Sequence, residues 1–244
     1  MSSSQTTPTP QQYNYVGKEL ELFARATNWK AYFRSELADV LVGDVLEVGA
    51  GIGETARHLL DGRQRSWLAL EPDPRLASKL GDWIAATKVA PKPSVKIGTI
   101  KDLNADSRFD TIIYIDVLEH IENDQSELSL AAELLRPGGH LIVLSPAFQQ
   151  LFSAFDESVG HYRRYTKASL AGIMPPSLRR RRLVYLDSVG YLASFANKAL
   201  LRQSLPSRRQ LTLWDRVMIP ASRVLDPLIG RRFGRSVLAV YARA

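Results

Sequence analysis

The chain of 244 residues contains no cysteine. This absence excludes disulfide bonds, zinc sites built on thiolates, and cysteine nucleophiles. The sequence also lacks any run of about 18 apolar residues, so no membrane-spanning helix is expected. Its first residues, MSSSQTTPTPQQ, lack the basic and apolar regions of a secretory signal. We therefore expect a soluble, cytoplasmic protein that is not integral to a membrane.

Acidic side chains are scarce in the second part of the chain. Residues 1–150 carry 15 basic and 20 acidic side chains, whereas residues 151–244 carry 17 basic and 5 acidic ones. The two parts therefore have net charges of −5 and +12, and the whole chain has +7. A basic half indicates an anionic partner, such as nucleic acid, lipid headgroups or a phosphorylated substrate. The alternative is a solvated basic face without a dedicated partner.

Short apolar runs alternate with longer segments of helical periodicity. Runs typical of strands buried on both faces occupy residues 45–50, 67–71, 94–98, 111–116 and 140–146. Patterns typical of helices occupy residues 53–61, 74–87, 124–136 and 167–174. Two more strands are predicted at residues 179–187 and 234–244. The sequence therefore predicts an α/β fold with a doubly wound, mostly parallel sheet of seven strands.

The remaining segments surround this sheet domain. Residues 1–12 are predicted to form a disordered tail, because Ser, Thr, Gln and Pro cannot bury enough apolar surface to offset the cost of ordering. Residues 13–42 are expected to form an N-terminal helical cap. Residues 188–234 have apolar residues at helical spacing but are too few to build their own core, so a helical insertion or lid is predicted. The sheet domain then comprises residues 43–187 and 235–244.

Three glycines at alternate positions follow the first predicted strand, in the segment DVLEVGAGIGETARHL. Glycines at such a turn let a ligand approach the backbone without meeting a Cβ atom. Gly49, Gly51 and Gly53 give G-x-G-x-G, whereas a dinucleotide fingerprint needs G-x-G-x-x-G. A P-loop sequence is absent as well. Glu71 ends the second strand about 20 residues later, where a carboxylate can accept hydrogen bonds from both hydroxyls of a ribose.

The segments VLEVGAGIG, LALEPD and ELLRPGGHLIVLSP resemble motifs I, II and III of the class I S-adenosylmethionine-dependent methyltransferases, in the same order and spacing. The resemblance covers residues 43–146. It implies a Rossmann-like fold, S-adenosylmethionine as cofactor and S-adenosylhomocysteine as product. It also implies that Glu47 orients the turn or binds the cofactor's amino group. The cofactor-binding residues that it implies are Glu47, Gly49, Ala50, Gly51, Gly53, Glu71, Pro72, Thr99, Ile100, Asp116, Val117 and Leu118.

Ionisable and aromatic residues crowd the segment FDESVGHYRRYTKASL, which follows the fifth strand at the rim where doubly wound folds bind ligands. This segment resembles a G-H-Y-R-R-Y signature of bacterial methyltransferases that modify glycans, lipids or secondary metabolites. His161 is the preferred general base, since histidine titrates near neutrality. His120 and Tyr162 complete the expected catalytic residues. Alternatively, the arginines of the loop pair with Asp156 and Glu157 and only staple it.

The resemblance implies an in-line SN2 methyl transfer, in which the protein aligns the reactants and removes a proton where the acceptor requires it. We expect O-methylation of a small-molecule acceptor that is apolar or anionic. The expected acceptor-binding residues are Tyr15, Trp29, Phe148, Arg164 and Tyr165. Two alternatives stay open: methylation of RNA or protein through the basic second half, and a non-catalytic cofactor-binding module.

Some target classes are disfavoured by the sequence. Methylation of exocyclic base amines uses N-P-P-Y or D-P-P-Y after the fourth strand, where this chain has Asp116-Val-Leu-Glu, and pyrimidine C5 methylation needs a cysteine. Nucleic acid is therefore not expected as a partner. The basic, amphipathic segment 188–234 can cover a pocket or rest on a membrane interface. Its return to a strand at Ser236 favours the pocket and leaves peripheral membrane contact as the alternative.

The segment DVLEHIEND also resembles the ubiquinone-pathway O-methyltransferases, in which neighbouring acids and a histidine can engage a divalent metal. The ligands that this overlap implies are Glu119, His120 and Glu122. The overlap is short, so no metal site is predicted. No oligomeric state is predicted either.

Overall fold

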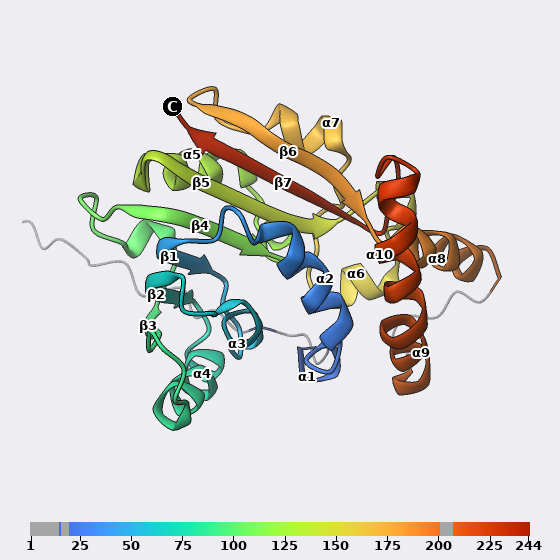
Figure 1. Ribbon diagram of the computed structural model, residues 1–244, viewed down its shortest axis with the longest axis horizontal. Helices are drawn as coiled ribbons and strands as arrows, with labels where there is room; N and C mark the ends of the chain where they lie inside the picture. The colour runs from blue at the N-terminus through green and yellow to red at the C-terminus, as the bar shows by residue number, and fades with distance from the viewer. Residues whose placement is uncertain (1–14, 16–19, 201–206) are drawn as a thin grey trace, which may run out of the picture.

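The computed structural model describes residue 15, residues 20–200 and residues 207–244, with residues 196–200 described in their backbone only. The tail predicted for residues 1–12 lies outside the described residues. Seven strands form one sheet in the order β3-β2-β1-β4-β5-β7-β6, and helices cover both of its faces (Figure 1). The strands are β1 (Gly43–Val48), β2 (Gln64–Glu71), β3 (Ser94–Ile97), β4 (Phe109–Ile115), β5 (Leu135–Pro146), β6 (Leu178–Leu186) and β7 (Ser236–Arg243).

One strand of the sheet, β7, runs against the others. β1 pairs in parallel with β2 and β4, β2 with β3, and β4 with β5. β7 is antiparallel to both β5 and β6, so β6 has the direction of β5. The prediction of a doubly wound, mostly parallel sheet of seven strands is confirmed. The carboxyl ends of β1 to β5 and the beginning of β7 therefore meet at one edge of the sheet.

Neighbouring residues of each strand face opposite sides of the sheet, and each side has its own core. Val45 of β1 belongs to a core that contains Tyr32 of α2, whereas Leu46 belongs to a second core that contains Leu128 of α5. The helices of the first core are α2 (Thr27–Leu37), α3 (Glu54–Leu59) and α4 (Pro74–Ala86); those of the second are α5 (Asp124–Leu134) and α7 (Lys167–Gly172). Strands buried on both faces explain why the apolar runs of the sequence are nearly continuous.

The boundary between α5 and β5 differs from the predicted one. α5 ends at Leu134, and β5 begins at Leu135 rather than at residue 140. Pro137 has no amide hydrogen, and Gly138 has a φ of +76°, so these two residues cannot continue the helix. The chain therefore leaves the helix earlier and the strand becomes longer than its apolar run.

Two buried carboxylates attach the helices that follow β6 to the N-terminal helices. These elements are α1 (Leu20–Phe23), α8 (Ser188–Leu200), α9 (Arg208–Leu213), the π-helical turn η4 (Trp214–Met218) and α10 (Ile219–Leu228). Asp215 accepts hydrogen bonds from the amides of Asn28 and Trp29 at the start of α2, at 3.3 and 3.0 Å. Asp226 accepts from the Tyr32 hydroxyl at 2.8 Å. These bonds hold the N-terminal and C-terminal helices together at the same end of the sheet.

Asp226 also caps the beginning of α8. Its carboxylate accepts from the amides of Asp187 and Ser188 at 2.7 and 3.0 Å, and such amides at a helix start have no partner within the helix. Within the described ranges, no helix combines the length and the apolar character that crossing a membrane requires. The cytoplasmic location stays a prediction.

Replacement of Asp226 by Ala should lower the free energy of unfolding by roughly 2–4 kcal/mol, because one hydroxyl and two amides lose their acceptor. Asp226→Asn retains one carbonyl oxygen and should lose about half as much. Urea denaturation followed by circular dichroism measures both values. If Tyr32→Phe lost as much as Asp226→Ala, the hydroxyl bond alone would account for the effect and the capping role would be refuted.

Candidate active site

The glycine turn between β1 and α3 forms one wall of a pocket at the carboxyl edge of the sheet. Gly49, Gly51 and Gly53 have φ values of +68°, +56° and +86°, a conformation that residues with side chains disfavour. The Gly49 amide donates to the carbonyl of Leu70 at the end of β2 (2.8 Å). A Cβ atom added at Gly51 would meet only the side chain of Leu20, another pocket residue, at 3.8 Å. A ligand can therefore approach the backbone of the turn closely.

Glu71 joins this turn to the end of β2. Its carboxylate accepts hydrogen bonds from the amides of Gly51 (2.7 Å) and Asp73 (2.9 Å). Burial raises the pKa of Glu71, and the two amide bonds act in the opposite direction. A carboxylate has about four acceptor positions, so about two remain for the hydroxyl groups of a ligand.

Glu47 lies beneath the turn rather than in the pocket wall. It is buried in β1, and its Oε2 accepts a hydrogen bond from the Trp67 indole at 2.8 Å. Burial raises the pKa of Glu47 to about 8, although the Trp67 and Thr55 hydrogen bonds lower it. Glu47 thus links β1 to β2 and to α3, which corresponds to the first of its two expected roles, orienting the turn.

The segment after β4 brings Asp116, Glu119 and His120 to the opposite wall, in and just before the short turn η2 (Leu118–His120). Burial lowers the pKa of His120 to about 4, so this imidazole is neutral at pH 7. Burial, followed by the charge of Asp116, raises the pKa of Glu119 well above its ordinary value. Within the described part of the chain, neither oxygen of the fully buried Glu119 carboxyl has a hydrogen-bond partner.

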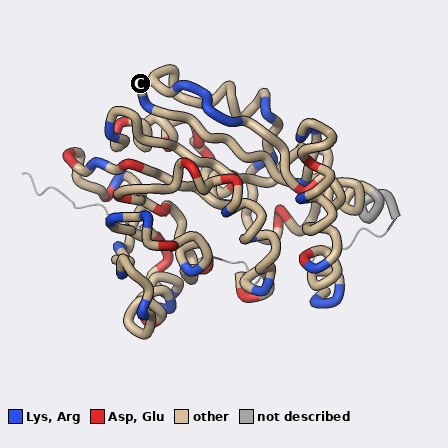
Figure 2. Tube along the Cα trace, in the orientation of Figure 1, with Lys and Arg blue, Asp and Glu red and all other residues tan. Residues whose placement is uncertain are grey.

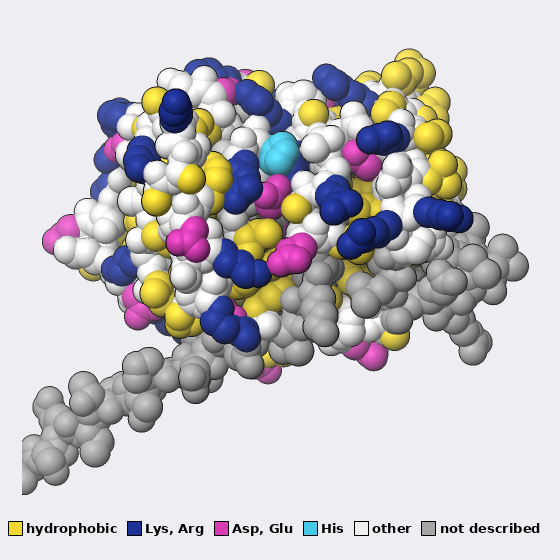
Figure 3. Space-filling model, turned by 90° about the horizontal axis from the view of Figure 1, so that it is seen from below, with side chains coloured by type: hydrophobic (Ala, Val, Ile, Leu, Met, Phe, Trp, Pro, Cys, Tyr) yellow, Lys and Arg dark blue, Asp and Glu magenta, His cyan; other side chains and the backbone are white. Residues whose placement is uncertain are grey.

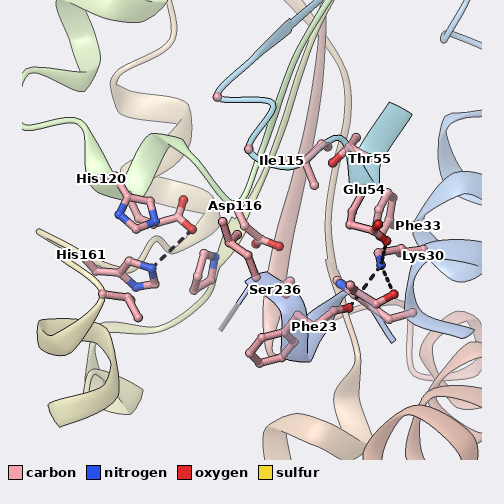
Figure 4. Close-up of a pocket in the computed structure, with 18 of the residues that line it drawn as sticks. Phe23, Lys30, Phe33, Glu54, Thr55, Ile115, Asp116, His120, His161 and Ser236 are labelled. Carbon is pink, nitrogen blue, oxygen red and sulfur yellow. Dashed lines mark hydrogen bonds and ion pairs between the residues drawn. The ribbon is translucent and has the colours of Figure 1, made fainter. Parts of the chain in front are cut away.

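His161 lies next to His120, with 4.5 Å between the ring centroids (Figure 4). Its Nδ1 is 2.9 Å from Oδ1 of Asp156, in helix α6 (Ala154–Ser158). Arg164 donates to the two oxygens of the same carboxylate at 2.8 and 3.0 Å. Burial opposes ionisation of Asp156, but the bonds from His161 and Arg164 outweigh it and hold its pKa well below the usual range.

The Asp156 bond determines which ring nitrogen of His161 is available. With Nδ1–H bound to the carboxylate, Nε2 is the nitrogen that can accept a proton. Nε2 lies 3.9 Å from Oε1 of Glu119, which is too far for a hydrogen bond. The arrangement is a carboxylate–imidazole pair whose basic nitrogen is free to act on a ligand.

Aromatic side chains and two cations complete the wall of the pocket. The aromatic residues are Tyr15, Phe23, Trp29, Phe33, Phe155 and Trp214. Lys30 is occupied, since its Nζ donates to the carbonyls of Phe23 and Ala24 and pairs with Glu54 at 3.1 Å. The Arg235 guanidinium lies 5.0 Å above the Trp214 ring, and none of the described residues forms a hydrogen bond or ion pair with it. Arg235 is thus the cation that is free to bind an anionic group.

The predicted site residues divide into those that line the pocket and those that lie elsewhere. The first group contains Tyr15, Trp29, Gly49, Ala50, Gly51, Asp116, His120, His161 and Arg164. The second contains Glu47, Gly53, Glu71, Pro72, Thr99, Ile100, Val117, Leu118, Phe148, Tyr162 and Tyr165. Val117 belongs to the second group and packs against the glycine turn. A Cβ atom added at Gly49 would lie only 2.7 Å from the Val117 side chain.

Three of the expected contacts with acceptor or reacting groups need correction. Tyr165 is only 2% exposed, and its hydroxyl donates to Asp124 in the core on the other side of the sheet. Tyr162 is 52% exposed and does not line the pocket. Phe148 stacks on Tyr185, with 4.6 Å between centroids. Side chains that follow one another in an irregular loop point in different directions. Closeness in sequence to His161 therefore did not bring Tyr162 and Tyr165 into the pocket.

The loop arginines are partly structural, as the alternative interpretation proposed. Arg164 pairs with Asp156, whereas Arg163 pairs with Asp124 (2.6 Å) rather than with Glu157. Arg164 therefore lines the pocket with its guanidinium already engaged.

The pocket residues that were absent from the predicted site include Phe23, Lys30, Glu119, Trp214 and Arg235. Glu119 adjoins His120 in sequence, and the density of ionisable groups around it was the available signal. Trp214 and Arg235 lie far along the chain from the motifs, and no local pattern marks them. The positions of α9, η4 and β7 in the fold bring them to the pocket.

Glu119, His120 and His161 also have the composition of a cation site. One ligand atom from each residue lies within 4.8 Å of the others. Imidazole and carboxylate are ligand types for Zn²⁺ and Mn²⁺. The set differs from the one implied by the sequence overlap, because His161 takes the place of Glu122, which is exposed.

Residues 21–176 match the protein family described as "Methyltransferase domain". The chain belongs to this methyltransferase family. A tRNA U34 carboxymethyltransferase from Syntrophotalea carbinolica is 30% identical over 125 residues, which are 48% of this chain and 38% of the relative. The methyltransferase therefore spans well under half the length of that relative.

Solved methyltransferase structures share the fold. The N-methyltransferase NodS from Bradyrhizobium japonicum WM9, in complex with S-adenosylhomocysteine, superposes with a TM-score of 0.55 at 16% identity, over 87% of this chain and 84% of NodS. An S-adenosylmethionine-dependent methyltransferase from Clostridium acetobutylicum superposes with a TM-score of 0.59 at 11% identity, over 90% of this chain and 92% of that protein. The class I methyltransferase assignment is confirmed, whereas the subtype suggested by the GHYRRY segment stays a prediction.

The glycine turn and its neighbours fit S-adenosylmethionine. The open backbone at Gly51, the free acceptor positions of Glu71 and the Asp116 carboxyl would hold the cofactor between the ends of β1, β2 and β4. When bound, the cofactor supplies a methyl group on a positively charged sulfur. The ionised form of the Asp116 carboxyl, which lines this pocket, favours such a charge.

Gly51→Ala should weaken S-adenosylhomocysteine binding by about 10-fold or more, because the methyl group occupies the ligand side of the turn and the positive φ disfavours a side chain. Gly62→Ala is a matched control, with a φ of +86° and no atom within 4 Å of the added Cβ. Calorimetric titration measures both affinities. Equal affinities in the two variants would show that the turn does not face the cofactor.

Glu47→Gln should change how stability depends on pH. The pKa of Glu47 is raised, so its stabilising contribution is fully present below the ordinary carboxyl pKa and is lost as the pH rises through about 8. Gln cannot ionise and avoids this loss. The melting temperature of the variant relative to the parent should therefore rise between about pH 5 and about pH 9. Scanning fluorimetry measures this difference, and a difference that stays constant with pH would contradict the assignment.

Proposed function

We propose that this methyltransferase transfers the methyl group of S-adenosylmethionine to a hydroxyl group of a small-molecule acceptor, with His161 as the general base. The observation that carries the proposal is the Asp156–His161 pair in the pocket wall. A hydroxyl oxygen must lose its proton as it attacks a methyl group, so a base within hydrogen-bond reach lowers the barrier.

Each polar residue around His161 has a distinct part in this reaction. Nε2 of His161 takes up the proton that the hydroxyl group of the methyl acceptor loses. Asp156 holds the Nδ1–H tautomer and stabilises the imidazolium that forms. Arg164 keeps Asp156 ionised and fixed in place. Asp156 and Arg164 are thus positioning residues, since they act through His161.

The pocket wall indicates the character of the acceptor. Aromatic rings from α1, α2, α6 and η4 provide an apolar surface, and Arg235 offers the one cation of the described wall that is not already paired. These features support an acceptor that combines an apolar or aromatic body with an anionic group. A cavity of this lining orients a small molecule through a few polar contacts.

RNA methylation is a second candidate, because the named relative acts on tRNA and the second half of the chain is basic. The run Arg179–Arg182, however, lies near the start of β6 and pairs with residues 240–242 of β7, whereas pocket residue Ser236 begins β7. The run therefore lies at the far end of the strands from the pocket (Figure 2). This placement favours a small molecule over RNA, a protein substrate or a non-catalytic role for the same pocket.

His161→Ala should lower turnover by about 10²-fold or more and leave S-adenosylhomocysteine affinity within about twofold, the pattern for loss of a general base. Turnover is measured as S-adenosylhomocysteine formation with a panel of phenols and aliphatic alcohols, with and without an anionic group. His140→Ala is the control, since this histidine pairs with Thr111 of β4 and Ala242 of β7, at the far end of the strands from the pocket.

Three results would contradict this role. Loss of melting temperature and cofactor affinity together in His161→Ala would show that the loop is only structural. An unchanged pH profile of turnover in the variant would point to an amine acceptor that needs no base. If a chelator abolished turnover of the parent and Zn²⁺ or Mn²⁺ restored it, the two histidines would be ligands and His161 would not be the base.

A further inference from the structure

The helices α8, α9 and α10 with the turn η4 carry most of the large apolar side chains that are exposed in the described part of the protein. In the described part of the chain, seven of ten exposed large hydrophobic residues belong to these elements. They are Leu192, Phe195, Leu213, Val217, Val224, Leu225 and Leu228. Leu228 is 77% exposed, and soluble surfaces do not usually gather such residues in one region.

Four of these residues form an apolar stripe along one helix. α9, η4 and α10 follow one another without a break from Arg208 to Leu228. Leu213, Val217, Val224 and Leu228 are spaced by four, seven and four residues, so they lie on one side of this helix. The opposite side is buried and contains Trp214, which lines the pocket. One side thus covers the pocket, and the other has no partner among the described residues.

A row of arginines runs beside the apolar stripe. Arg209, Arg216 and Arg223 recur at intervals of seven residues and are exposed, which places them on one flank of the stripe. Figure 3 shows basic side chains among the hydrophobic ones at the end of the molecule where α9 and α10 lie. Long arginine side chains in this position can keep their charge in the headgroup layer while the stripe enters the apolar layer.

Negative charge is absent from the described part of the same surface. Residues 188–234 contain eight basic side chains and two acidic ones, Asp215 and Asp226. Both acids are buried and bind groups of α2 and α8. The exposed side of the described part of this segment therefore carries basic, apolar and neutral polar residues and no acidic one. This combination complements an anionic lipid surface, whereas RNA would match the arginines and leave the stripe in water.

We propose that the apolar stripe and the arginine row dock the protein on anionic membrane surfaces. The docked helix also carries Trp214 on its inner side, so the pocket lies next to the membrane. An acceptor with an apolar portion held in the bilayer could then reach the pocket directly. That consequence rests on the proposed function, whereas the docking itself does not.

Sedimentation with vesicles of phosphatidylcholine and phosphatidylglycerol tests the proposal at physiological salt. The parent should sediment with these vesicles and bind pure phosphatidylcholine at least about 10-fold more weakly. Arg209→Glu/Arg216→Glu/Arg223→Glu should weaken binding by roughly 10²-fold or more. Arg179→Glu/Arg180→Glu/Arg181→Glu changes the net charge equally on β6, at the far end of the sheet, and should bind like the parent.

A second variant separates lipid insertion from simple charge attraction. Leu213→Ser/Val224→Ser/Leu228→Ser should weaken vesicle binding by about 10-fold or more while keeping S-adenosylhomocysteine affinity and the circular dichroism spectrum. Those two readouts, taken without vesicles, show whether the fold and the cofactor site are intact independently of docking.

Five outcomes would overturn the proposal, and the first four concern the vesicles and the oligomeric state. These are no sedimentation of the parent with anionic vesicles, equal losses in the two arginine variants, parent-like binding by the serine variant, or a dimer of the parent in sedimentation velocity that the serine variant abolishes. In the last case the stripe would be an interface between two copies of the chain. Tighter binding to tRNA than to vesicles, unaffected by the serine changes, would assign the arginines to RNA.

Discussion

The strand order reverses between β1 and β4, and the pocket depends on this reversal. The chain leaves β1 toward β2 on one side and leaves β4 toward β5 on the other, so the segments after the two strands diverge and a crevice opens between them. The glycine turn lies on one side of this crevice, and Asp116, Glu119 and His120 lie on the other. The N-terminal and C-terminal helices cover the part of this crevice that the sheet does not enclose.

Buried carboxyl groups hold together the segments of the chain that surround the pocket. Asp156, Asp215 and Asp226 each accept several hydrogen bonds from separate segments of the chain. A buried carboxylate is stable only with such partners, so each one fixes the segments around it. Glu119 is the exception, since it is fully buried and neither of its oxygens has a hydrogen-bond partner among the described residues. An unsatisfied group of this kind indicates a place where a proton, a ligand or an ion completes the structure.

The two faces of the α9-η4-α10 helix connect the chemistry to the surroundings of the protein. The inner face contributes Trp214 to the pocket and Asp215 to the start of α2, so its position is coupled to the N-terminal helices. The outer face combines exposed apolar residues with arginines. A single helix thereby forms a pocket wall on one face and the proposed docking surface on the other, and the π-helical turn at Trp214 belongs to this helix.

The sequence by itself determined the sheet, the cofactor and about a third of the residues that line the pocket. Motifs such as Gly49 to Gly53 act over a few residues, because a positive φ at a turn requires glycine whatever surrounds it. Apolar runs likewise predicted the strands, since strands buried on both faces need them. Tertiary structure alone decided the rest. Trp214 and Arg235 reach the pocket from the far end of the chain, Tyr165 turns into the core, and His161 gains its carboxylate through the fold of α6. These outcomes depend on how irregular segments pack against one another, and no periodicity in the sequence encodes the direction in which a loop side chain points.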